Sequence, residues 1–279
     1  MIFLFVIPQY GIVYNVILHQ FDCTDMSLNS NIDKSSLAFS AEELLCIQMQ
    51  DYTMERCKLI LEQQNKEGVI TIPFYFELYP KYFLDILGDD APLLIHISGD
   101  LDIFSENKRI AIIGSRKADD KGLKAAYQLA YKYASMGYVI VSGLALGCDT
   151  AAHKGCLQAG GRTIAVVASG LNFTHPKCNK LLQDEIVNNG GAIITEYPFG
   201  IKANPTRLVE RCRLQIGLSQ EVIVAQSSPE SGTMYAVQFA RRYLGTKNIY
   251  AVEFDKYDDN NLGNKYLIEQ GIAKPITIE

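Results

Sequence analysis

From residue 109 onward the chain alternates between short apolar segments and longer amphipathic ones, and this alternation constrains the fold more than any other feature. RIAIIG at 109–114 is almost wholly apolar, and apolar residues then recur at helical spacing over 120–136. Strands that are apolar throughout are typical of a parallel sheet with helices on both faces, because each strand buries both of its sides. The sequence therefore predicts a doubly wound, mainly parallel α/β fold of extended Rossmann-like type. Six strands are expected at 109–114, 138–142, 163–168, 192–195, 222–225 and 249–252, with helices at 120–136, 149–158, 177–189, 206–216 and 232–243.

The chain before residue 107 has a different pattern. Ser40 followed by Glu43 is a capping box and predicts the start of a helix. A second helix is expected at 53–65, followed by short strands and turns punctuated by prolines. We therefore predict a small, mainly helical N-terminal domain with its connecting segment at 40–106 and a Rossmann-like core at 107–279.

Residues 1–39 are an uncertain lead-in. The first 18 residues are apolar but contain no Lys or Arg, are interrupted by Pro8, and precede no small-residue cleavage site. This pattern disfavours a signal peptide, and a membrane span even more. The segment is either a buried β-hairpin or a mis-annotated stretch ahead of a true start at Met26, and we favour the second alternative.

The seven cysteines form no CxxC pair and no cluster with histidines. A scattered, odd-numbered set is typical of reduced thiols, so we expect a cytoplasmic protein without a structural metal or cofactor.

The formal net charge of −5 hides an asymmetry along the chain. Residues 108–252 contain 18 Lys and Arg against 9 Asp and Glu, whereas the remainder contains 8 against 22. A basic core between acidic segments favours a polyanionic partner, although solvated helix faces can also differ in charge by chance.

The loops that follow the predicted strands have the composition of an anion-binding site. In such sheets, ligands bind outside the carboxyl ends of the strands. Glycines and small hydroxyl residues at a helix start present backbone N–H groups to an anion, and Arg and Lys add positive charge. The candidate phosphate-binding residues are Gly114, Ser115, Arg116, Gly143, Gly147, Gly170, Lys177, Asn179, Arg211, Arg213, Ser231, Gly232 and Thr233.

Four neighbouring residues have structural interpretations of their own. Asp149 is expected to cap the helix that follows it, and His153 to be a packing residue rather than a catalyst. Tyr197 and Phe199 either stack on bases or belong to the core.

Taken together, these loops resemble the DprA/Smf family of bacterial DNA-processing proteins. The resemblance rests on segments such as IAIIGSR (110–116), VSGLALGCDTAAHKGCL (141–157) and GGAIITEYPFG (190–200), and extends over about residues 70–276. It implies an extended Rossmann fold, binding of single-stranded DNA, dimerisation, and loading of the RecA recombinase during uptake and recombination of DNA, without catalytic activity. The DNA contacts that it implies are Ser115, Arg116, Gly170, Lys177, Arg211 and Arg213.

The sequence departs from the family pattern at three positions. Family members usually have Arg where Leu146 stands, Tyr where His175 stands and Asn where Cys212 stands. Each replacement removes a polar or stacking contact, so the affinity for DNA is expected to be weaker or its geometry altered.

Two other functions fit the same fold. Nucleoside-monophosphate phosphoribohydrolases share this core and use a GGxGTxxE loop, but Ala236 stands at the position of its Glu. The acid that such chemistry needs is absent there, which argues against an enzyme. A small-nucleotide sensor using the same crevice is the other alternative.

Overall fold

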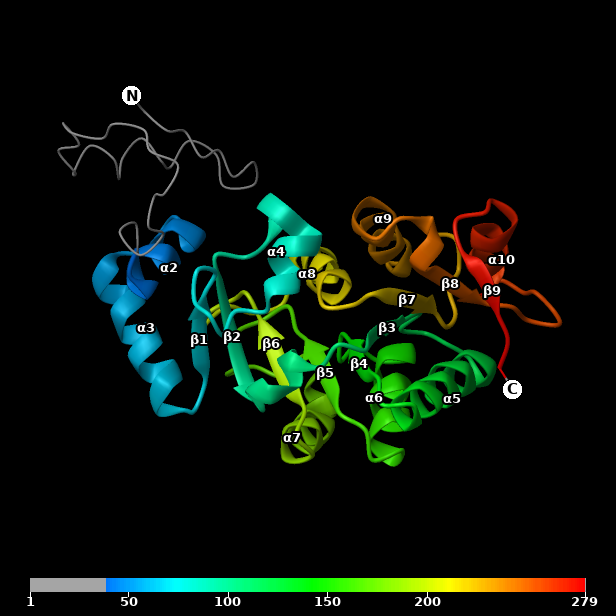
Figure 1. The fold of residues 1–279 in the computed structure, drawn as a ribbon, viewed down its shortest axis with the longest axis horizontal. Coiled ribbons are helices and arrows are strands. Elements are labelled where there is room, and N and C mark those ends of the chain that lie inside the picture. Colours follow the sequence, from blue (N-terminus) through cyan, green and yellow to red (C-terminus); the bar gives the residue numbers. More distant parts are fainter. Residues whose placement is uncertain (1–38, 279) are drawn as a thin grey trace, which may run out of the picture.

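The structure, a computed structural model, describes residues 39–278, and within this range a single sheet organises the molecule (Figure 1). Its strands are β1 (Ile70–Pro73), β2 (Leu94–Gly99), β3 (Arg109–Ile113), β4 (Val139–Ser142), β5 (Thr163–Val166), β6 (Ala192–Thr195), β7 (Glu221–Val224), β8 (Ile249–Val252) and β9 (Lys274–Ile276). They are ordered β1-β2-β6-β5-β4-β3-β7-β8-β9. The run from β6 to β9 is parallel, whereas β2 pairs antiparallel with both β1 and β6. All six expected strands are present, and β1, β2 and β9 extend the sheet.

Helices cover both faces of this sheet, which confirms the doubly wound α/β prediction. Successive residues of β3 point to opposite faces: Ala111 and Ile113 pack in one core, and Ile110 and Ile112 in the other. Figure 1 shows α5, α6 and α7 on one face and α4, α8, α9 and α10 on the other. The helices are α2 (Ala41–Met49), α3 (Met54–Lys66), α4 (Lys81–Leu87), α5 (Asp120–Ser135), α6 (Cys148–Gln158), α7 (Lys180–Asn188), α8 (Pro205–Gly217), α9 (Thr233–Tyr243) and α10 (Leu262–Glu269).

The N-terminal helices form a small layer against the outer strands. The expected capping box is present, because the Ser40 Oγ accepts from the Glu43 N–H and the Glu43 carboxylate accepts from the Ser40 N–H. Helices α2 and α3 share a core with Leu93 and Leu94. Since β1 and β2 belong to the same sheet as the Rossmann-like strands, the sheet continues through both parts of the chain. The domain division at residues 106 and 107 stays a prediction, and the interpretations of the lead-in, including a start at Met26, concern residues outside the described range.

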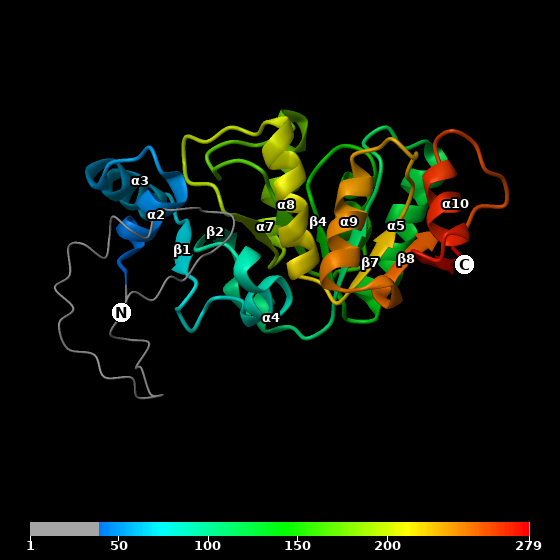
Figure 2. The same cartoon turned by 90° about the horizontal axis from the view of Figure 1, so that it is seen from above.

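The order of the strands places a switch point between β3 and β7. From β3 the chain moves outward through β4, β5 and β6, and then returns to the other side of β3 with β7. Loops leaving β3 and β7 therefore separate towards opposite faces and leave a crevice between them. Helices α8 and α9 pack against each other, and Figure 2 shows both in front of the sheet. Helix α9 is the one that follows β7. None of the helices within 39–278 is long and apolar enough to cross a membrane.

Candidate functional site

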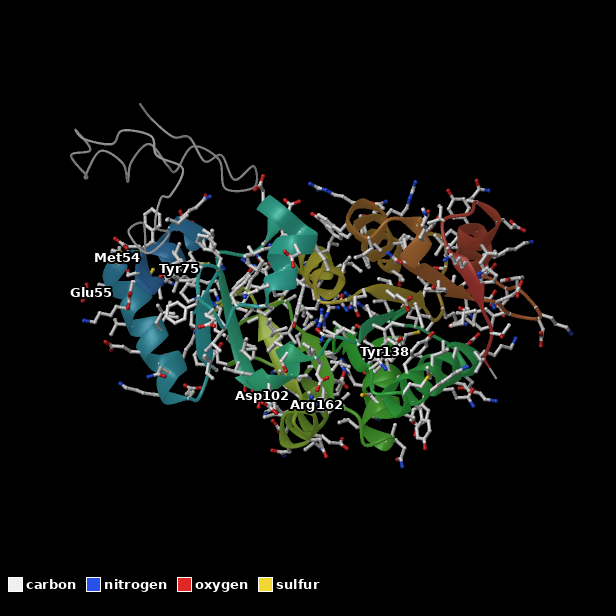
Figure 3. The ribbon with its side chains drawn as sticks, viewed as in Figure 1. Met54, Glu55, Tyr75, Asp102, Tyr138 and Arg162 are labelled. Atoms are coloured by element: carbon white, nitrogen blue, oxygen red, sulfur yellow. The ribbon has the colours of Figure 1, made fainter. Side chains whose placement is uncertain are left out.

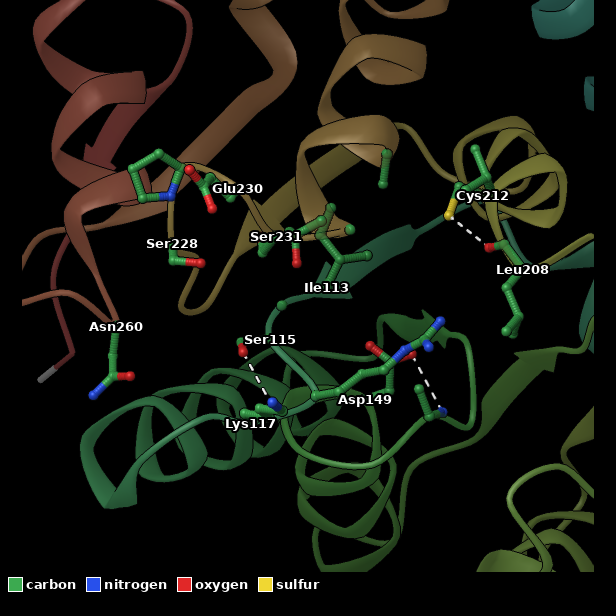
Figure 4. Close-up of a pocket in the computed structure, with 18 of the residues that line it drawn as sticks. Ile113, Ser115, Lys117, Asp149, Leu208, Cys212, Ser228, Glu230, Ser231 and Asn260 are labelled. Carbon is green, nitrogen blue, oxygen red and sulfur yellow. Dashed lines mark hydrogen bonds between the residues drawn. The ribbon is translucent and has the colours of Figure 1, made fainter. Parts of the chain in front are cut away.

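A cleft of about 960 Å³ lies at the switch point, beyond the carboxyl ends of β3 and β7. Figure 4 shows Ser115 and Lys117, from the loop after β3, on one side of it and Ser228 and Ser231, from the loop after β7, on the other. Helix α8 contributes a further wall, with Leu208 and Cys212 labelled in the same view. The loops after β3, β4 and β7 thus meet at this cleft, whereas no residue of the loops after β5 and β6 lines it.

Glycines allow the first two of these loops to pack tightly against each other. A Cβ on Gly147, where φ is +76°, would lie 2.2 Å from the Ser115 carbonyl oxygen, and a Cβ on Gly114 would lie 2.5 Å from the Cys148 Sγ. The Cys148 N–H donates to the Ser115 carbonyl at 3.1 Å. These two glycines are therefore required by contacts between loops, whatever binds above them.

Arg211 lines the cleft but is almost completely buried. Arg211 is 4% exposed. Its Nη1 donates to the Gly143 carbonyl and to the Val166 carbonyl, the second at 2.7 Å. Its Nη2 lies 3.6 Å from the Asp149 Oδ2. A Cβ on Gly143 would overlap the guanidinium, so this glycine makes room for Arg211. One side chain thus ties together the loop after β4, the last residue of β5 and the first turn of α6.

Asp149 does not cap its helix, contrary to the expectation. The helix begins at Cys148 with Gly147 at the N-cap. The Asp149 carboxylate instead accepts from the Ala145 N–H at 3.3 Å and faces Arg211. Burial raises the pKa of Asp149, and the positive charge of Arg211 opposes this effect.

Arg213 is held in the interior by a second carboxylate. Its Nη1 and Nη2 donate to the two Glu196 oxygens at 2.8 and 2.5 Å, and the two side chains are 8% and 6% exposed. This bidentate geometry is the strong form of such a pair. The structure therefore places both α8 arginines that the resemblance assigned to DNA under the loops, each beside a buried carboxylate.

Of the three candidates in and after the loop that follows β5, only Lys177 is exposed. A Cβ on Gly170 would lie 2.3 Å from the Pro198 carbonyl oxygen, so this glycine packs against the loop after β6. Asn179 is 6% exposed, and its Nδ2 donates to the Leu144 carbonyl and the Thr150 Oγ1, both at 2.8 Å. Gly170 and Asn179 fix the loop that presents Lys177.

The loop after β7 brings a helix N-terminus to the cleft. Gly232 is the N-cap residue of α9, and no side chain caps the first turn. The Ser231 Oγ lies 2.7 Å from the Ser227 Oγ, and Thr233 is buried at the first helical position. The positive end of an 11-residue helix at the cleft wall suits an anion.

The exposed basic side chains in the loops after β3, β5 and β6 are Arg116, Lys117, Lys177 and Lys202. None of them forms a salt bridge with any residue between 39 and 278. Partial burial and the charges of Arg116 and Arg211 lower the pKa of the exposed His175. His175 therefore adds no positive charge at neutral pH. The exposed carboxylates of Glu230 and Asp259 line the cleft beyond β7 and β8, so the exposed positive charge is concentrated in the loops on the other side of the switch point.

The other positions singled out in the sequence divide between surface and interior. Leu146 is 47% exposed, whereas Cys212 is 8% exposed, with its Sγ 3.5 Å from the Leu208 carbonyl oxygen. Phe199 is a core residue, while the half-buried Tyr197 donates its hydroxyl to Glu210 at 2.9 Å.

His153 is fully buried with both ring nitrogens engaged. Its Nδ1 lies 2.8 Å from the Thr163 Oγ1, and its Nε2 accepts from the Leu144 N–H at 3.3 Å. Burial lowers its pKa to about 3. This neutral, hydrogen-bonded ring has the packing role that we expected.

Sequence reasoning missed one wall of the cleft. Asp259, Asn260 and Leu262, which follow β8, line it, as do Pro205 and Leu208 at the start of α8. The Asn260 Nδ2 lies 3.3 Å from the Asp119 Oδ2 and so links this loop to the start of α5. The rule that ligands bind beyond the carboxyl ends of the strands applies equally to β8 and could have identified this loop.

No group of three or more His, Cys, Asp or Glu side chains within the described part of the chain is arranged to hold a metal ion. The site is built from backbone donors, a helix end and exposed cations.

The fold and the cleft define a Rossmann-like protein whose switch-point cleft is lined by the exposed cations Arg116 and Lys117 and by the N-terminus of a helix. Residues 71–279 match the family of DNA recombination-mediator protein A, and the chain belongs to this DprA/Smf family. It is 37% identical over 188 residues to the DNA processing protein DprA of Streptococcus pneumoniae, covering 67% of this chain and 64% of that protein. It is 31% identical to the DprA of Bacillus subtilis, covering 78% of this chain and 71% of that protein.

Two solved structures share the fold. The X-ray structure of the DNA processing protein A of Streptococcus pneumoniae superposes with a TM-score of 0.68 at 32% identity, over 80% of this chain and 77% of that one. A DNA processing protein A from Helicobacter pylori, described for its single-stranded DNA binding mode, gives a TM-score of 0.65 at 29% identity, over 75% of this chain and 90% of that one.

Proposed function

We propose that this protein binds single-stranded DNA at the switch-point edge of its sheet, with Arg116 and Lys177 as the principal phosphate contacts. The observation that carries the proposal is the contrast among its basic residues. Arg211 and Arg213 face buried carboxylates, whereas Arg116 and Lys177 are exposed on two different loops and have no salt bridge within the described residues. Exposed cations free of carboxylate partners are available to phosphates.

A strand of several nucleotides fits this arrangement better than one nucleotide does. The cations extend from the loop after β3 to the loop after β5, beside the open cleft and the N-terminus of α9. Successive phosphates along a strand can reach separate loops, whereas a single nucleotide carries its charge in one place. The relative from Helicobacter pylori, described for its single-stranded DNA binding mode, supports the same choice.

We further propose that the protein acts without catalysis, in the cytoplasm, as a homodimer that assists loading of RecA onto DNA during transformation and recombination. The absence of a catalytic acid at Ala236, a buried residue of the cleft wall, supports the non-enzymatic assignment. Membership of the DNA-processing family supports the partner. Co-sedimentation with RecA on single-stranded DNA and sedimentation equilibrium of the free protein test the partner and the dimer separately.

The proposal is tested by fluorescence anisotropy with labelled oligo-dT and a duplex of equal length, at two salt concentrations. We expect the protein to prefer the single strand. Arg116→Ala and Lys177→Ala should each weaken binding roughly tenfold, since a charge-assisted hydrogen bond contributes about 1.5–3 kcal/mol. Each variant should also reduce the slope of log K against log salt by about 0.7, the value for one phosphate contact on a single strand.

Lys132→Ala is the matched control, because Lys132 is an exposed lysine in the last turn of α5, at the opposite edge of the sheet. Equal weakening by all three variants would show only loss of overall charge and would contradict the assigned site. Hydrolysis of a nucleoside monophosphate by the purified protein would establish the enzymatic alternative instead.

A further inference from the structure

Helices α2 and α3 bring two cysteines into close contact far from the cleft. The Cys46 Sγ lies 2.9 Å from the Cys57 Sγ and 3.4 Å from the Met54 Sδ. Figure 3 labels Met54 at the end of the molecule formed by α2 and α3. A thiol pair on two facing helices at this separation needs little movement to reach the bonding distance of a disulfide, about 2.05 Å.

The two thiols differ in accessibility, as thiol–disulfide exchange in two steps requires: one must be reachable from solvent, and the other must lie beside it. Cys46 is partly exposed, whereas Cys57 is fully buried. Burial, together with the neighbouring Cys46, raises the pKa of Cys57 to about 12. An external disulfide therefore meets Cys46 first, and Cys57 is placed to attack only a sulfur already joined to Cys46.

These helices also hold the loop after β6. On α2, the Gln48 Nε2 donates to the Glu196 carbonyl, and its Oε1 accepts from the Leu94 N–H at 3.2 Å. On α3, the Gln64 Oε1 accepts from the Phe199 N–H at 2.9 Å. Cys46 precedes Gln48 by two residues, so a bond between α2 and α3 would fix the two glutamines relative to each other.

We propose that Cys46 and Cys57 form a reversible disulfide with a low-molecular-weight disulfide such as oxidised glutathione as the co-reactant, and that the bond stiffens the loop at 196–201. The Cys46 thiolate attacks oxidised glutathione, forms a mixed disulfide and releases one glutathione. Cys57 then loses its proton and attacks the Cys46 sulfur, which expels the second glutathione. Two protein thiols are oxidised and one small disulfide is reduced to two thiols. Intracellular disulfides of this kind are usually redox-sensing rather than structural.

The test equilibrates the full chain with buffers of varied glutathione ratio, blocks remaining thiols with N-ethylmaleimide and digests with trypsin. Cleavage after Lys34, Arg56 and Lys58 places Cys46 in peptide 35–56 and Cys57 in peptide 57–58. We expect these two peptides to become linked, to separate on reduction, and amide hydrogen exchange at 196–201 to slow several-fold in the oxidised protein. The readouts do not depend on DNA binding, so they remain informative if the proposed function is wrong.

Controls separate the pair from other thiols. Cys46→Ser should abolish the linked peptides and the change in exchange, and Cys57→Ser should do the same if its buried site tolerates the hydroxyl. Cys178→Ser, which removes an exposed cysteine, should change neither readout. Separate maleimide or glutathione adducts on Cys46 and Cys57 at every ratio would overturn the disulfide, and linked peptides with unchanged exchange at 196–201 would overturn its effect on the loop.

Discussion

Replacement of Arg211 by Ala tests the structural role of the buried arginine. In the native structure its guanidinium faces Asp149 at 3.6 Å and donates to the carbonyls of Gly143 and Val166. The side chains of Arg211 and Asp149 are 5% and 6% exposed. Arg211→Ala therefore leaves an uncompensated carboxylate and two carbonyls without this donor in the interior.

The expected loss is large because a buried ion pair is broken on one side only. Such changes cost about 3–5 kcal/mol in the free energy of unfolding. With a urea m-value of about 3 kcal/mol/M, the midpoint should fall by roughly 1–1.7 M. The chain contains no Trp, so the unfolding transition is best followed by far-ultraviolet circular dichroism.

A double-mutant cycle identifies the cause of the loss. Asp149→Asn in the Arg211→Ala background removes the unpaired charge and should restore part of the stability, which a simple cavity would not do. In Arg211→Ala, burial keeps the pKa of Asp149 raised, so the folded state binds this proton more tightly than the unfolded state does. The stability that the variant loses relative to the wild type should therefore shrink as the pH falls and Asp149 is neutralised. A midpoint within about 0.3 M of the wild type, equivalent to roughly 1 kcal/mol, would refute the reasoning.

Two further predictions concern the loops and the buried histidines. Gly147→Ala should lower the free energy of unfolding by about 2 kcal/mol or more, since its Cβ meets a backbone oxygen at positive φ. Gly137→Ala, also at positive φ but with no atom within 4 Å, is the matched control and should lose less; equal losses would rule out the contact between loops as the cause. Burial lowers the pKa values of His96 and His153 to about 3, so the unfolded state binds their protons first as the pH falls below 6.5. Each of the two histidines should therefore lower the free energy of unfolding by up to about 1.4 kcal/mol for every pH unit between pH 6.5 and 3. Urea titrations at pH 7 and pH 5 measure this loss. His153→Asn should reduce this dependence, and an unchanged slope would contradict the assigned burial.

The fold class, and the sheet edge that carries the candidate site, were predictable from the amino-acid sequence. Strands such as RIAIIG are apolar on both sides because helices cover both faces, and this pattern is local to the chain. The capping box at Ser40 and Glu43 is likewise a short-range contact, which is why it could be located in advance. Topology then brings the ends of parallel strands to one edge, so the loops could be assigned together.

Which cations face solvent depends on tertiary packing. Arg116, Arg211 and Arg213 are equivalent in the sequence, but two of them meet carboxylates that other segments bring into the interior. Glycines that suggested room for a ligand instead allow loops to pack on each other, as Gly147 does against Ser115. Partners of this kind are distant along the chain and set by packing, and no local pattern encodes them. The sequence thus predicted the edge at which a polyanion would bind, and the structure shows that Arg116 and Lys177, rather than the α8 arginines, are exposed there.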